Sequence, residues 1–422
     1  MKKIISIFII GTVANLTASG CAPIPVNTVP LHLRDKRPIV YETPPSKNGY
    51  YSFITFHPDG KKLAFYDSEN QSIKILSVDN FVQTKEFKTK NSPVSMRFSP
   101  LGKFIVAETV LKSGYPFVSR QASTNYSKWE EKRVEIIDFN TGNISINTRC
   151  DAQFPFIGHY FSHDELEFSL LCGNGEQQNW EVPTWKRKNN TLLPSFFEKE
   201  GVISKTNQKE NDQKIDPKST YSKDDRYIAI SYSKLDPGKE VKGFRDMKNI
   251  AIYDRNTSLY SIISPECQAV TIAENGFSND GRKVAILCKE NISSSVEIWR
   301  NEDEKTIPEK KFVFGYNAGL GTIRPEGVAL SPDGKHVAIA ILGMVEALLV
   351  HPLVLFAPPL GMTRSDLRVY SMDKDRELVA ISIEKMLENG PDLAFSPDGS
   401  LLALADKTIR IYKTNDLIKK SE

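Results

Sequence analysis

A turn that recurs seven times constrains the fold of this chain more than any other feature. Each copy begins with Phe, Tyr or Leu followed by Ser or His, and most copies continue with Asp and Gly. Where present, Pro pre-sets φ, Asp hydrogen-bonds to its own backbone, and Gly adopts the positive φ that closes a hairpin. We number the repeats one to seven by these turns, at residues 56–60, 98–102, 161–164, 221–225, 277–281, 330–334 and 395–399.

Apolar segments on both sides of the turns predict the strands. The segment after the turn is nearly continuously apolar, which indicates burial on both faces; examples are residues 62–65, 104–107, 227–230, 284–287, 337–340 and 401–404. A third segment alternates, as a half-buried strand does; it occurs at residues 73–76, 134–137, 250–253, 296–299, 367–370 and 409–412. A weaker fourth segment follows most of these, for example at residues 83–88, 143–148 and 377–382.

Seven repeats of four antiparallel strands indicate an all-β chain, a seven-bladed β-propeller spanning residues 38–415, followed by a C-terminal tail at 416–422. The repeats resemble the WD-repeat and WD-like propellers, including the periplasmic propeller of the Tol–Pal system. The Trp-Asp pair of that family is replaced here by Tyr253-Asp254, Trp299-Arg300 and Tyr370-Ser371, and its Gly-His pair survives as Gly158-His159. The resemblance therefore implies the fold and leaves the function open.

The last repeat contains only three strand segments, so its fourth strand must come from elsewhere. Residues 38–42, Pro-Ile-Val-Tyr-Glu, precede the first repeat and have strand character. We expect them to be the outer strand of the last blade, because closing the ring removes an exposed sheet edge.

The N-terminus has the pattern of a secretory signal. Lys2 and Lys3 precede an apolar run from Ile4 to Val13, which is too short for a membrane span, and small residues lead to Cys21. This end resembles the lipobox of bacterial lipoproteins, although Ala18 stands where Leu is usual. An ordinary signal cleaved near Gly20 is the alternative.

The lipobox resemblance implies the location of the protein. Residues 1–20 would be a removed signal peptide, Cys21 would be acylated, and residues 21–37, with three prolines, would be an extended tether. Ala22 rather than Asp after the cysteine implies sorting to the outer membrane, facing the periplasm, if the organism has two membranes. Inner and outer membrane are not distinguished further.

Four further cysteines suggest disulfides in an exported chain. Cys150 precedes the first strand of repeat three and Cys172 ends its second strand; Cys267 and Cys288 hold the equivalent places in repeat five. The start of one strand faces the end of the next in an antiparallel hairpin. The register therefore predicts the pairs Cys150–Cys172 and Cys267–Cys288, and no Cys-x-x-Cys motif suggests redox catalysis.

Successive turns are 42 to 65 residues apart, whereas a minimal blade needs about 40–45. The surplus lies at residues 110–132, 234–248 and 343–366, between second and third strands, and at 194–217, between repeats three and four. In a propeller these connections open on one face. Candidate partner-contact residues are the aromatics of the first insertion and the apolar residues of the third: Tyr115, Phe117, Tyr126, Trp129, Leu348, Leu349, Leu353, Leu355 and Phe356. Whether the third insertion is exposed or folds over the channel mouth is left open.

Catalytic signals are weak. Of six histidines, only His159 on an innermost strand and His351 in the apolar insertion could face a channel. No nucleophile elbow, phosphate-binding glycine loop or metal-spaced cluster is present, so we expect neither a metal nor a cofactor. The formal charge of +3 falls to +1 without Lys2 and Lys3, which argues against a nucleic-acid binder.

These features favour a lipid-anchored interaction scaffold that binds an envelope protein through its loop-decorated face. One alternative is a propeller enzyme of lactonase or dehydrogenase type, which would need ionisable side chains converging on the channel mouth. Another is a carbohydrate or peptidoglycan binder, for which Tyr126 and Trp129 are the candidates. The oligomeric state and the identity of the partner are open.

Overall fold

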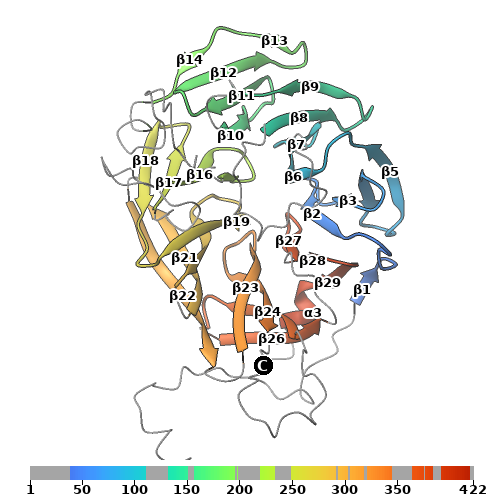
Figure 1. Ribbon diagram of the computed structural model, residues 1–422, viewed down its shortest axis with the longest axis vertical. Coiled ribbons are helices and arrows are strands. Elements are labelled where there is room, and N and C mark those ends of the chain that lie inside the picture. The colour runs from blue at the N-terminus through green and yellow to red at the C-terminus, as the bar shows by residue number, and fades with distance from the viewer. Residues whose placement is uncertain are drawn as a thin grey trace, which may run out of the picture. The chain divides into compact units, whose positions relative to one another are not determined.

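The computed structural model describes residues 39–110, 132–150, 156–194, 197, 219–232, 249–290, 293–302, 305–317, 321–344, 364–374, 376–383 and 391–418. These residues form antiparallel sheets that follow one another in chain order around a propeller (Figure 1). The expected all-β propeller of four-stranded blades is therefore confirmed.

The first two sheets are regular four-stranded blades. Repeat one comprises β2 (Tyr51–Phe56), β3 (Lys62–Asp67), β4 (Ser72–Ser77) and β5 (Gln83–Lys88). Repeat two comprises β6 (Pro93–Phe98), β7 (Phe104–Val110), β8 (Lys132–Asp138) and β9 (Ile144–Thr148). Their second and third strands contain the segments that the apolar patterns predict.

Repeat three differs at its outer edge. It comprises β10 (Phe156–Phe161), β11 (Glu167–Cys172) and β12 (Glu176–Glu181), and two short strands pair with different parts of β12: β13 (Lys186–Arg187) and β14 (Thr191–Leu192). Repeat four is again regular, with β15 (Ser219–Tyr221), β16 (Tyr227–Tyr232), β17 (Asn249–Asp254) and β18 (Leu259–Ile263).

Repeats five and six depart from the expectation of separate blades, because they form one eight-stranded sheet. Repeat five comprises β19 (Ala269–Phe277), β20 (Lys283–Lys289), β21 (Ser293–Glu302) and β22 (Lys305–Asn317). Repeat six comprises β23 (Gly321–Leu330), β24 (His336–Met344), β25 (Arg364–Ser371) and β26 (Arg376–Ile383). The long β22 pairs with the start of β23, Tyr316 with Thr322 and Asn317 with Gly321, which joins the two sets edge to edge.

The N-terminal strand closes the last sheet, as predicted. The order is β1 (Ile39–Glu42), β29 (Ile409–Lys413), β28 (Leu401–Ala405) and β27 (Asp392–Phe395), with β1 antiparallel to β29. Tyr41 of β1 stacks on Phe81, with ring centroids 5.0 Å apart. The short helix α3 (Thr414–Ile418) follows β29 and buries Leu417.

The core lies between neighbouring repeats. The buried apolar residues of the described ranges form clusters that each combine two successive repeats, and one cluster joins repeat seven to repeat one. Ile54 and Leu63 there pack with Ala403 and Ile411. Burial of apolar area stabilises by roughly 25 cal/mol per Å², so each repeat depends on both neighbours and the ring forms as a unit.

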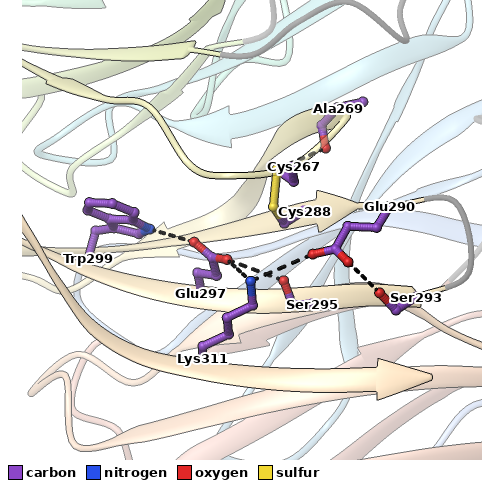
Figure 2. Close-up of a disulfide and its surroundings, with 9 residues drawn as sticks. All are labelled: Cys267, Ala269, Cys288, Glu290, Ser293, Ser295, Glu297, Trp299 and Lys311. Atoms are coloured by element: carbon purple, nitrogen blue, oxygen red, sulfur yellow. Dashed lines mark hydrogen bonds and ion pairs between the residues drawn. A yellow bond between two sulfur atoms is a disulfide. The ribbon is translucent and has the colours of Figure 1, made fainter. Parts of the chain in front are cut away.

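Both predicted disulfides are present, Cys150–Cys172 and Cys267–Cys288. Figure 2 shows the second one at the end of β20, beside a polar ladder on β21 and β22. There the Lys311 ammonium lies 3.0 Å from Glu297 and 3.7 Å from Glu290. Trp299 Nε1 donates a hydrogen bond to Glu297 as well, so this ladder fixes the outer strand of repeat five.

Candidate functional site

The innermost strands and the turn tips enclose a cavity of about 160 Å³ along the propeller channel. Strand residues such as Ser95, Arg97 and Ser219 line its deeper part. The residue that follows the turn Ser or His lines its outer part in five repeats: Pro58, Lys223, Asn279, Pro332 and Pro397. The repeat that builds the fold thus also builds this cavity.

The turns hold their shape through a short hydrogen-bond network. In repeat seven, Ser396 Oγ donates to Asp398 Oδ1 at 2.6 Å and accepts from the Leu401 N–H at 2.9 Å, while Gly399 adopts φ of +72°. The same Ser–Asp bond recurs in repeats three to six. The turn aspartates are therefore explained by turn geometry, as the sequence indicates.

Two turns have a carboxylate where the other five have glycine. Glu165 and Asp225 adopt φ of +55° and +56° at this position, which is costly for a residue with a Cβ. Each carboxylate reaches a neighbouring repeat: Glu165 Oε1 accepts from the Leu101 N–H at 2.6 Å, and Asp225 Oδ2 accepts from the Phe161 N–H at 2.9 Å. These hydrogen bonds between repeats offset the energetic cost of the positive φ angles.

Asp225 is also the anchor of a buried polar cluster that spans repeats two, three and four. Its Oδ1 lies 2.7 Å from Arg97 Nη1, and the Asp225 side chain is fully buried. The Arg97 guanidinium stacks over the Tyr221 ring at 4.1 Å, and its Nη2 lies 3.0 Å from His159 Nδ1. We call Arg97, Glu108, His159, Tyr221 and Asp225 the inter-repeat cluster.

The hydrogen bonds determine the state of His159. Arginine only donates, so His159 Nδ1 must accept from Arg97, and Nε2 carries the proton that faces Glu108 Oε1 at 3.2 Å. The His159 ring stacks on Tyr221, and Tyr221 Oη accepts from the His159 N–H at 2.9 Å. A second ring proton would point at the Arg97 guanidinium, so the neutral imidazole fits this place.

The pKa values of His159 and Glu108 are both lowered, for different reasons. Burial lowers the pKa of His159, the Arg97 charge lowers it further, and Glu108 and Asp225 oppose this in part. Burial raises the pKa of Glu108, but the hydrogen bond from His159, together with the charges of Lys132 and Arg97, outweighs burial and holds it below the ordinary value. At neutral pH the pair is therefore neutral His159 and ionised Glu108.

The inter-repeat cluster contains the residue types of a reactive centre, but the polar atoms of His159, Tyr221 and Asp225 already have hydrogen-bonding partners. Both nitrogens of His159 and both carboxylate oxygens of Asp225 have protein partners. Tyr221 Oη is likewise engaged by the His159 N–H and by Ser219 Oγ at 2.7 Å. Because these groups are buried and satisfied by one another, the geometry is that of a connection between repeats rather than a general acid or base.

Comparison with known proteins places the fold. The family model WD40 (WD domain, G-beta repeat) matches residues 391–413, and no curated protein matches. Among 1503 matching chains of solved structures is the crystal structure of the Myceliophteria thermophila Cps50 (Swd1) beta-propeller domain. It has a TM-score of 0.55 and 12% identity over 89% of this chain and 99% of that chain. These matches support a WD-repeat β-propeller. At this identity the likeness concerns the fold alone.

The predicted site residues divide into two groups. The four paired cysteines and His159 lie in the described residues, and His159 is on an innermost strand as expected. The lipidation candidate, His351 and all partner-contact candidates lie outside them: Cys21, Tyr115, Phe117, Tyr126, Trp129, Leu348, Leu349, Leu353, Leu355 and Phe356. Those predictions therefore stand untested.

Sequence reasoning missed Arg97, Glu165 and Asp225. The signal for the two carboxylates was available, since a non-glycine residue at a left-handed turn position needs a reason. Arg97 gave no recognisable sequence signal, because its partner Asp225 is 128 residues away in the chain.

No group of three or more His, Cys, Asp or Glu in the described part of the chain is arranged to hold a metal ion. No helix in the same residues is both long and apolar enough to cross a membrane.

Proposed function

We propose that the chain is a lipid-anchored envelope protein whose seven-bladed propeller binds a partner protein through one face. The observation that supports this proposal is the position of the strand ends that the insertions connect. The β7–β8 ladder ends at Val110 with Lys132, the β16–β17 ladder at Tyr232 with Asn249, and the β24–β25 ladder at Gly343 with Arg364. All three long connections leave the blades at the ends opposite the hairpin turns.

Because the three long connections start at the same end of their blades, a partner protein on that side could contact several repeats at once. The three connections belong to repeats two, four and six, which are distributed around the propeller. Propellers serve as rigid supports for such loops, and the WD-repeat fold suits a protein interaction scaffold. We call this surface the insertion face.

The enzyme alternative has weaker support. Four ionisable side chains, Arg97, Glu108, His159 and Asp225, do converge near the channel, as that alternative requires. However, their mutual pairing leaves no accessible base or nucleophile among them. The carbohydrate-binding alternative rests on Tyr126 and Trp129, which lie outside the described residues, and it stays a hypothesis.

The docking proposal is tested by deleting residues 345–360 and replacing them with a Gly-Ser linker. Crosslinking in the native envelope should then lose a partner that the wild type captures, because the apolar insertion would supply the contact. Deletion of the polar residues 234–248 is the matched control and should retain the partner. An unchanged crosslinking pattern after the first deletion would argue against docking through this insertion.

Lipid anchoring is tested separately by Cys21→Ser. We expect this variant to lose incorporation of labelled fatty acid and to move from the membrane fraction to the soluble envelope fraction. Ala22→Ser, which keeps the cysteine, is the control. Fatty-acid labelling that persists in Cys21→Ser would refute the acylation site.

A further inference from the structure

Lys223 breaks the turn rule at the channel mouth. The position after the turn Ser or His is Pro in repeats one, two, six and seven, where the ring pre-sets the φ that the turn needs. In repeats four and five it is Lys223 and Asn279, and both line the cavity. When a residue that lines a cavity does not suit its local turn, we expect a functional reason for it.

Asn279 has a structural explanation. Its Nδ2 donates to the Pro397 carbonyl at 3.0 Å, and its N–H donates to the Pro332 carbonyl at 2.9 Å. Asn279 thus ties the turns of repeats five, six and seven together and gives the mouth a fixed shape. Its second amide hydrogen remains available beside the cavity.

Lys223 has no such explanation. Its side chain is exposed to solvent within the lining and forms no hydrogen bond or ion pair with any described residue. Partial burial lowers the pKa of the Lys223 ammonium. The negative charge of Asp398, on the turn of repeat seven, opposes this shift in part. An ammonium that is partly desolvated and unpaired gains from an arriving anion.

The other charges of the lining narrow the class of ligand. Arg97 is neutralised by Asp225, and Glu274, the carboxylate of the lining, is engaged by a partner of its own. One unpaired positive charge matches a monoanionic group better than a phosphate dianion, which would need more cations. Ser95 lies in the same lining, and its hydroxyl can donate a hydrogen bond to an oxygen ligand.

Size limits the ligand as well. One water molecule needs roughly 10–15 Å³ of such space, so the cavity of about 160 Å³ admits a group of several heavy atoms. It is smaller than the roughly 300–1,000 Å³ of sites for drug-sized molecules. We propose that the turn-side mouth of the channel binds a carboxylate group through Lys223 and Asn279. The group could belong to a small free acid or to an acidic side chain of an inserted peptide.

The test measures binding to the full chain, purified in detergent, by calorimetric titration. The probes are butyrate, a capped Gly-Glu-Gly peptide, inorganic phosphate and the neutral analogue butyramide. We expect at least one carboxylate probe to bind and butyramide not to bind. Tighter binding of butyrate would identify a free acid as the ligand, and tighter binding of the peptide would identify an inserted acidic segment.

Lys223→Pro is the decisive variant, because it restores the turn residue of four other repeats and no backbone hydrogen bond of Lys223 is lost. We expect it to keep the melting temperature and to weaken carboxylate binding at least tenfold. Lys61→Ala, on the turn of repeat one outside the lining, should bind as the wild type does. Unchanged affinity in Lys223→Pro, no binding of either carboxylate, or tighter binding of phosphate would overturn the proposal.

Discussion

Asp225 connects three repeats through a single carboxylate. It occupies a left-handed turn position that glycine takes elsewhere, and it meets Arg97 of repeat two and the Phe161 N–H of repeat three. The strain of the backbone is of order 1–2 kcal/mol. Leaving a buried charge without its partner costs more, about 3–5 kcal/mol, so the connection outweighs the strain.

Replacing Asp225 with Gly should therefore destabilise the protein, although glycine suits the backbone better. We expect the free energy of unfolding to fall by about 2 kcal/mol, the difference between losing the pair and relieving the strain. Denaturant titration measures this fall. In a double-mutant cycle, Asp225→Gly and Arg97→Met should be strongly non-additive, and additive effects would contradict the pairing.

His159 should make stability depend on pH. Its folded pKa lies below its ordinary value near 6.5, so unfolded chains bind more protons once the pH drops below that value. The stability that His159 contributes is present above about pH 6.5 and is lost as the pH falls through the folded pKa. The melting temperature should accordingly fall between pH 7.5 and pH 5.

His159→Gln should reduce this slope but not remove it, because burial also lowers the pKa of His336 and gives a contribution of the same sign. Equal slopes in His159→Gln and the wild type would show that His159 does not titrate as the geometry requires.

At the scale of secondary-structure elements, the two disulfides contribute to stability by linking neighbouring strands. The two disulfides close loops of similar length, with sequence separations of 22 and 21 residues. They differ in their surroundings: Cys150 and Cys172 pack in the core between repeats two and three, whereas Cys267 is only partly buried. The polar ladder on Glu297 and Lys311 supports the second site independently of the sulfurs.

Each disulfide should contribute about 3 kcal/mol on the entropic account. We expect Cys150→Ala with Cys172→Ala to lower the melting temperature more than Cys267→Ala with Cys288→Ala, because the first pair leaves vacant space in a packed core. In the wild type, titration of the denatured, unreduced protein should find no free thiol among these four cysteines. A free thiol there would contradict the pairing.

The first strand closes the ring, since β1 supplies the edge partner of β29. Deleting residues 37–43 should lower both the melting temperature and the solubility, because the edge of β29 and the face of Phe81 would be exposed. Deleting residues 23–35 instead should leave the melting curve unchanged. An unchanged curve after the first deletion would show that β1 does not stabilise the ring.

At the scale of the whole molecule, local chemistry predicted the repeats and the missing fourth strand predicted ring closure by β1, whereas two other long-range contacts were not predicted. The turns and second strands could be read directly because each depends on a few adjacent residues, and the disulfides followed from the register. The junction of β22 with β23 could not be predicted, because it depends on strands continuing past the normal blade edge. The inter-repeat cluster escaped for a related reason, since Arg97 and Asp225 meet only when the repeats assemble.

The central claim is that the insertion face binds another envelope protein, and photo-crosslinking in the native envelope tests it most directly. A photoreactive amino acid would replace Lys132 or Met344, at strand ends on the insertion face, or Asp59 or Asp280, at the hairpin turns. The account predicts crosslinks to one partner protein from Lys132 and Met344 and none to that protein from Asp59 and Asp280. Crosslinks to that protein only from the turn positions, or from neither face, would contradict it.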